Sequence, residues 1–135
     1  MPSIYINLPV ADLAASTAFY QALGFVKNDQ LSNDKGTALA FDGLYVMLLT
    51  HDFYKGFLPA HKTIADAHTT SAVLNAMECV SKEQVDAIYD KAIAAGGKAT
   101  IPTQDHGFMY GRDFEDLDGH IWEMFWMDVS QIPQA

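Results

Sequence analysis

The feature that most constrains this chain of 135 residues is an internal repeat. Each half holds a strand pattern, a helix pattern and three further strand patterns, and an Asp-Gly pair precedes the last strand of each half. The pairs are Asp42-Gly43 and Asp118-Gly119, and they favour tight turns because both residue types tolerate positive φ. A repeat of this length predicts two copies of one supersecondary unit.

The first copy covers about residues 3–50. Residues 4–10 alternate between apolar and mixed positions, which indicates a strand. Asp12 is placed to cap a helix over about 13–23, and Gly24 is placed to end it. Three further strands are predicted at 25–26, 37–41 and 44–49.

The second copy covers about residues 72–128 and begins with a strand over 73–80. Ser81 and Gln84 form a capping-box pattern ahead of a helix whose apolar residues recur at helical spacing. Three strands follow, at 98–100, 109–114 and 120–127. The polar connector between the copies, about 51–71, is longer than an ordinary loop and is either a lid or a crossover that holds a short helix.

Composition and charge exclude some classes of partner. The net charge is −9 with a single arginine, Arg112, so the surface repels the phosphates of nucleic acid. No apolar run approaches the roughly 20 residues of a membrane span. We therefore expect a cytoplasmic domain with neither a nucleic acid nor a membrane as partner.

Glu123 is an isolated carboxylate in the apolar final strand. A buried charge is costly unless a cation or several donors meet it. Alternation along a strand places Glu123 on one face with Ile121, Phe125 and Met127. The intervening residues Trp122, Met124 and Trp126 then face the helices or a partner chain. This pattern indicates either a functional site or a solvated strand face.

Several of these segments together resemble the vicinal oxygen chelate superfamily of glyoxalases, bleomycin-resistance proteins and extradiol dioxygenases. They are Leu8-Pro9-Val10-Ala11-Asp12-Leu13, Ser16, Phe19-Tyr20, Leu23-Gly24-Phe25 and Asp116 to Glu123. Within it, the chain is most similar to proteins labelled predicted lactoylglutathione lyases. The resemblance implies an α+β fold of two tandem βαβββ modules that form a cupped mixed sheet with helices on the outer face. It also implies a single domain over 1–135 and a homodimer.

Metal-dependent members take ligands from the first and last strands of each module. Glu123 matches one such position, whereas Tyr5, Asn75 and Leu48 match the others, with Met47 replacing Leu48 if the Asp-Gly turns are aligned. One carboxylate with a phenol and an amide is a poor site for Zn, Ni or Fe. We therefore expect no cofactor; the alternative is a divalent metal on Glu123 completed by His106, His51 or a partner chain.

The cup that the resemblance implies has the lining of a small-molecule pocket. Its predicted ligand-binding residues are Tyr5, Asn7, Leu48, Asn75, Met77, Tyr110, Arg112 and Phe125, around a catalytic Glu123. Arg112 either binds a ligand carboxylate or pairs with a neighbouring acid, Asp113, Glu115 or Asp116, and pairing is favoured.

Three functions are compatible with these residues. The leading hypothesis is a protein that binds a small organic molecule in a cup whose metal site is degenerate. The second is an enzyme of the glyoxalase I type, a lyase or isomerase, with Glu123 as base or metal ligand. The third is a structural or regulatory dimer with a filled cavity.

Overall fold

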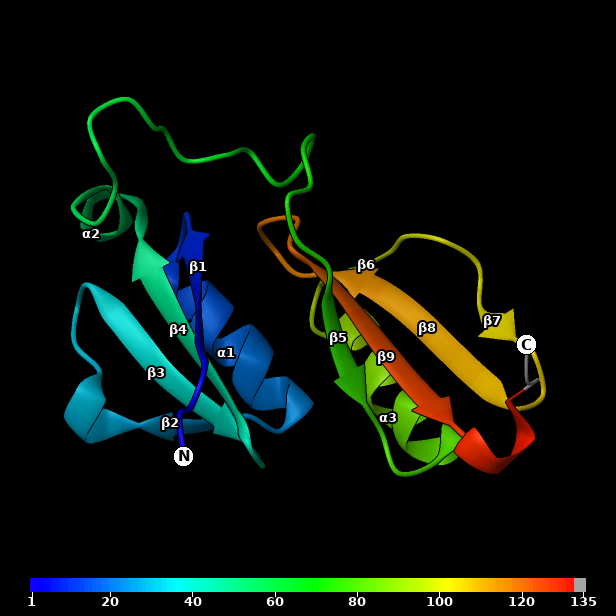
Figure 1. The fold of residues 1–135 in the computed structure, drawn as a ribbon. Helices are drawn as coiled ribbons and strands as arrows, with labels where there is room; N and C mark the ends of the chain where they lie inside the picture. The colour runs from blue at the N-terminus through cyan, green and yellow to red at the C-terminus, as the bar shows by residue number, and fades with distance from the viewer. Residues whose placement is uncertain (133–135) are drawn as a thin grey trace. The chain divides into compact units, whose positions relative to one another are not determined.

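The computed structural model describes residues 1–132 and divides into two compact units, 1–70 and 71 onward (Figure 1). The boundary falls at the end of the predicted connector. Each unit has the order strand, helix, then further strands, and the hydrogen-bonded strands form one sheet in each unit. The predicted α+β class with two βαβββ modules is thereby confirmed. Among the described residues, no helix is long and apolar enough to span a membrane.

Unit 1 is built on a four-stranded mixed sheet with the order β1-β4-β3-β2. β1 pairs in parallel with β4, and the other pairs are antiparallel. Its elements are β1 (Tyr5–Val10), α1 (Leu13–Leu23), β2 (Val26–Asn28), the 3-10 turn η1 (Asp29–Leu31), β3 (Gly36–Phe41), β4 (Leu44–Thr50) and α2 (His51–Lys55).

Unit 2 repeats this topology with the order β5-β9-β8-β6, and β7 also pairs with β8. β5 runs parallel to β9, and β8 and β9 form a long antiparallel hairpin. Its elements are β5 (Asn75–Glu78), α3 (Lys82–Ala94), β6 (Lys98–Ala99), β7 (Gln104–Asp105), β8 (Met109–Glu115), β9 (Ile121–Met127) and the 3-10 turn η2 (Val129–Gln131). The short strand β7 was not predicted.

Both long helices begin at the predicted caps. The Asp12 side chain accepts a hydrogen bond from the Ala15 N–H at 3.0 Å, and Ser81 Oγ accepts one from the Gln84 N–H at 3.1 Å. These bonds satisfy N–H groups that the first helical turn leaves free. The Gln84 side chain accepts in turn from the Val80 N–H at 2.8 Å, which gives a reciprocal cap close to the predicted box.

Each helix covers one face of its own sheet (Figure 1). The buried side chains between helix and sheet are almost all aliphatic or aromatic, and Tyr20, Val46, Val85 and Phe114 are fully buried. Burial of such side chains contributes roughly 1.5–3 kcal/mol each and is the main stabilising term of each unit.

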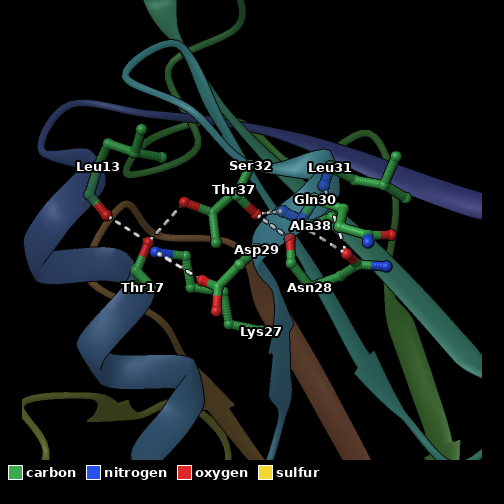
Figure 2. Close-up of polar contacts among 10 residues, drawn as sticks. All are labelled: Leu13, Thr17, Lys27, Asn28, Asp29, Gln30, Leu31, Ser32, Thr37 and Ala38. Carbon is green, nitrogen blue, oxygen red and sulfur yellow. Dashed lines mark hydrogen bonds and ion pairs between the residues drawn. The ribbon is translucent and has the colours of Figure 1, made fainter.

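A buried hydroxyl pair joins α1 to β3 in unit 1 (Figure 2). Thr17 Oγ1 donates to the Leu13 carbonyl at 2.7 Å and lies 2.8 Å from Thr37 Oγ1. Because the Thr17 proton is used within the helix, Thr37 donates to Thr17. Nearby, the Asn28 side chain accepts from the N–H groups of Gln30 and Leu31 and so caps η1.

Candidate functional site

The final strand, β9, places its residues on two faces as the alternation predicts. Trp122 and Met124 are 2% and 1% exposed and belong to the core. Trp126 lies on the same side, where the Lys82 ammonium of α3 is 5.5 Å from its ring centre. Glu123, Phe125 and Met127 point to the other side and line a pocket. Glu123 is therefore on the face away from the helix.

This pocket, which we name the β8–β9 pocket, has a volume of about 470 Å³. Its lining residues are Ala76, Ile101, Gln104, Met109, Gly111, Asp113, Glu123, Phe125 and Met127. Pockets that bind small molecules have volumes of about 300–1,000 Å³ and a mainly apolar lining with a few polar groups. The β8–β9 pocket matches this description, and all of its lining lies in unit 2.

Two carboxylates face each other in the β8–β9 pocket. Asp113 of β8 lies directly opposite Glu123 of β9 in the antiparallel register, and directly opposite residues project to the same face. Burial, and then the charge of Glu123, raise the pKa of Asp113 above its ordinary value. Both effects disfavour the ionised form. The pocket therefore holds two adjacent carboxyl groups, and Gln104 is the other polar side chain of its mainly apolar lining.

The turn before β9 fixes this register. The buried Asp116 carboxylate accepts hydrogen bonds from the N–H groups of Asp118 and His120, both at 2.9 Å. Gly119 adopts a φ of 91°, a left-handed conformation that favours glycine. A hairpin's turn determines which residues of its strands pair. The Asp-Leu-Asp-Gly-His sequence therefore sets the position of Glu123 relative to β8.

Three predicted ligand-binding residues face the helix side instead of the cup. Leu48 is 0% exposed and belongs to the core of unit 1. Asn75 pairs with Trp122 and donates to the Ile121 carbonyl at 3.4 Å, and Met77 pairs with Met124. The expectation that these residues face the cup is wrong. In the observed strand pairing, the side chain that faces the open side belongs to the residue one position away from each of them. Their neighbours Met47 and Ala76 occupy the open face.

Tyr110 and Arg112 also lie against the helix, in a polar cluster with α3. The Tyr110 hydroxyl donates to Asp86 at 2.6 Å, and Arg112 Nη1 donates to the same oxygen at 2.9 Å. The Arg112 guanidinium also stacks on the Tyr89 ring at 3.8 Å. The hydrogen bond from Tyr110, together with the Arg112 contact, lowers the pKa of Asp86. Structural pairing of Arg112 is thus observed, with Asp86 rather than Asp113, Glu115 or Asp116 as its partner.

Tyr5 and Asn7 lie on the open face of unit 1, and neither lines the β8–β9 pocket. The Tyr5 ring stacks on Tyr45 with ring centres 4.7 Å apart. Asn7 lines a pocket of about 300 Å³. The other residues of that lining are Leu49, Tyr54, Phe57 and Leu58. Of the predicted site residues, the structure therefore brings only Glu123 and Phe125 together in the β8–β9 pocket.

The described residues do not provide a metal site of the predicted kind. His51 is exposed at the start of α2, and His106 is exposed in the loop after β7; neither lines the β8–β9 pocket. Within residues 1–132, no three His, Cys, Asp or Glu side chains are grouped closely enough to hold a metal ion. Asp113 and Glu123 alone are a poor donor set for Zn, Ni or Fe, which take imidazole or thiolate ligands with carboxylates.

Asp113 and Gly111 were missed as pocket residues. Asp113 is one of the three acids that the sequence offers as a partner for Arg112, but the two residues alternate between opposite faces of β8. The sequence did contain a signal, because Asp113 and Glu123 are each five residues from the turn residue Asp118. Counting outward from the turn would have placed them opposite each other.

The fold has close structural relatives. Hypothetical protein SA1046 from S. aureus superimposes with a TM-score of 0.78 at 26% identity, covering 93% of this chain and 94% of that one. A glyoxalase/bleomycin resistance protein/dioxygenase family enzyme from Burkholderia phytofirmans PsJN gives 0.76 at 21% identity, covering 92% and 97%. The fosfomycin resistance protein FosX from Listeria monocytogenes gives 0.68 at 21%, covering 96% of each chain. No curated protein matches the chain.

Paired βαβββ units with helices on one face of each sheet define the fold class of the chain. The sequence profile of the Glyoxalase/Bleomycin resistance protein/Dioxygenase superfamily matches residues 4–124, nearly the whole chain. The protein therefore belongs to this superfamily. Because one fold can support many activities, its function has to be argued from the pocket itself.

Proposed function

We propose that this protein binds a small organic molecule in the β8–β9 pocket, with Glu123 as the polar anchor and no metal ion. The observation that carries the proposal is a pocket of about 470 Å³ in which Glu123 and Asp113 stand among mostly apolar side chains. A few polar groups in an apolar lining fix the orientation of a bound molecule and give specificity.

A fragment screen tests the binding. A set of small amines, alcohols and carboxylic acids would be titrated into the protein, with amide chemical shifts in β8 and β9 as the readout. We expect saturable shifts around Gly111 and Phe125 that disappear in Gly111→Val, whose side chain fills the floor of the pocket. If no fragment at millimolar concentration shifts these residues, or if Gly111→Val changes nothing, the proposal is wrong.

The alternative function is a metal-dependent lyase or isomerase of the glyoxalase I type. It can be tested with the same purified protein. Protein purified without a histidine tag would be analysed for metals and assayed for hemithioacetal isomerisation. We expect substoichiometric metal and no turnover, because two carboxylates are a weak donor set for these ions. Stoichiometric Zn, Ni or Fe that disappears in Glu123→Ala would contradict the metal-free assignment.

We also propose that the protein is a homodimer, in line with its superfamily resemblance. Light scattering coupled to size-exclusion chromatography measures the mass directly. A mass of about twice 14.9 kDa supports the proposal, and a monomer at all concentrations contradicts it.

A further inference from the structure

The floor of the β8–β9 pocket consists of three cross-strand pairs. Asp113 pairs with Glu123, Gly111 with Phe125, and Met109 with Met127. We name them the acidic, glycine and methionine rungs. All six residues line the pocket, so its floor changes from charged to apolar along the hairpin. With about 3.4 Å per residue along a strand, the three rungs span about 14 Å.

The glycine rung makes the pocket hollow at its centre. A Cβ at Gly111 would meet its nearest atoms at 3.7 and 3.8 Å, which is ordinary van der Waals contact, and Gly111 is absent from the positive-φ residues. Neither the backbone conformation nor the packing requires glycine here. Any larger side chain would fill the space beside Phe125. This glycine therefore leaves the middle of the pocket free for a ligand.

Within the part of the chain that the structure describes, no cation balances the acidic rung. Among residues 1–132, neither Asp113 nor Glu123 forms an ion pair, and no lysine, arginine or histidine belongs to the pocket lining. Like charges directly opposite each other on adjacent strands destabilise the pair. A positive charge held between the two carboxylates would remove this repulsion and form charge-assisted hydrogen bonds.

We propose that the β8–β9 pocket takes an elongated organic amine in a fixed orientation. The protonated nitrogen is held between Asp113 and Glu123, and the apolar body lies over Gly111 against Phe125. The far end contacts the thioethers of Met109 and Met127, which suit aromatic rings and irregular apolar shapes. This inference rests on the proposed function and adds the chemical class of the ligand, its orientation, and a role for Asp113.

Three probes that differ only at one end test the charge. Isothermal titration calorimetry would compare 4-phenylbutylamine, 4-phenylbutan-1-ol and 4-phenylbutyrate. We expect the amine to bind at least about tenfold more tightly than the alcohol, and the acid to bind least, since a charge-assisted hydrogen bond contributes about 1.5–3 kcal/mol. Equal or tighter binding of the alcohol or the acid would overturn the inference.

Charge-removing variants test which residues hold the nitrogen. Asp113→Asn and Glu123→Gln should each weaken the amine by about tenfold or more and leave the alcohol nearly unchanged. Glu83→Gln removes the same charge from an exposed position on α3 and should change neither. If Glu83→Gln weakens the amine as much as the pocket variants, the effect is one of net charge and the inference is wrong.

Nuclear Overhauser contacts test the orientation. The phenyl protons of the bound amine should contact the methyl groups of Met109 and Met127, and Gly111→Val should abolish these contacts. A reversed orientation overturns the inference. Suppose that Gly111→Val weakens binding of the alcohol and the acid but does not affect the amine. The proposed function is then supported, and the assignment of an amine as ligand is wrong. If no probe binds, the amine class is wrong, and the fragment screen decides separately whether the proposed function stands.

Discussion

The two units share one topology but differ in what they place on the open face of the sheet. Met47 and Glu123 each lie four residues after the glycine of an Asp-Gly pair. In unit 1, Met47 pairs with Ala38, whereas in unit 2 Glu123 pairs with Asp113. The same position of the repeat is therefore apolar in one unit and a carboxylate pair in the other.

The strand positions two residues before Ala38 and Asp113 are both glycine. Gly36 pairs with Leu49, and Gly111 pairs with Phe125. A Cβ at Gly36 would meet Leu49 Cδ2 at 3.0 Å and the Leu48 carbonyl oxygen at 3.2 Å, whereas a Cβ at Gly111 would meet its nearest atoms at 3.7 and 3.8 Å, which is ordinary contact. One glycine thus permits close packing, and its counterpart leaves a pocket.

The contacts between helix and sheet also correspond. Thr17 and Asp86 each lie five residues after a helix cap, and each contacts the residue that follows the strand glycine. Thr17 bonds to Thr37 through buried hydroxyls, and Asp86 forms an ion pair with Arg112 at 2.9 Å. The repeat therefore conserves the position of a helix–strand contact while its chemistry changes. The helix side holds the fold, and the open side is where function can diverge.

The largest difference in stability between substitutions in the two units is expected at the corresponding glycines, Gly36 and Gly111. Gly36→Ala should destabilise the protein by about 1–3 kcal/mol, because the new methyl group is forced against a backbone oxygen and a buried leucine. Gly111→Ala should be neutral or stabilise by up to about 1 kcal/mol, since glycine weakens a strand interior. Urea denaturation measures both changes. Equal losses at the two positions would show that the pocket floor is as tightly packed as the core.

A smaller difference is expected at the helix–strand contacts. Thr17→Val leaves the buried Thr37 hydroxyl without its acceptor and should cost about 1–2 kcal/mol at any salt concentration. Asp86→Asn removes one charge of a partly exposed ion pair and should cost less than about 1 kcal/mol. Added salt should reduce the stability loss in Asp86→Asn and leave the loss in Thr17→Val unchanged. Urea denaturation at low and high salt would show this, and a salt-dependent loss in Thr17→Val would contradict it.

The smallest effect concerns the pH dependence that the acidic rung gives to unit 2. Because the pKa of Asp113 is raised above 3.8, the folded state binds more protons than the unfolded state between 3.8 and the raised value. The free-energy cost of the Asp113 charge in the folded state is absent below pH 3.8. It grows as pH rises toward the folded pKa and is complete above it. Asp113→Asn should therefore melt slightly above the wild type at pH 7, and the gap should narrow as pH falls toward 3.8.

Melting curves of the wild type and Asp113→Asn from pH 3.5 to 8 measure this difference. Glu83→Gln is the control, because Glu83 is exposed on α3 and far from the acidic rung in sequence. An Asp113→Asn variant that is less stable than the wild type at pH 7 would mean that the carboxylate has a stabilising partner.

Much of the architecture could be predicted from the chain because it depends on local signals. The caps at Asp12 and Ser81, the turns at the Asp-Gly pairs and the alternation around Glu123 act over a few residues. The site was harder to predict from the sequence. Matching whole strands to a family pattern placed Leu48, Asn75 and Met77 in the cup, whereas they face the helix side. A shift of one residue moves a side chain to the opposite face of a sheet.

The sequence by itself determined the repeat, the superfamily resemblance and the outward face of Glu123, because each follows from periodicity and short-range backbone preferences. Only the tertiary structure decided that Asp113 stands opposite Glu123, that Arg112 turns to Asp86, and that Gly111 leaves a hollow where Gly36 does not. These features depend on strand register and on how closely neighbouring strands of the chain approach each other. Both are set by packing between segments distant in sequence.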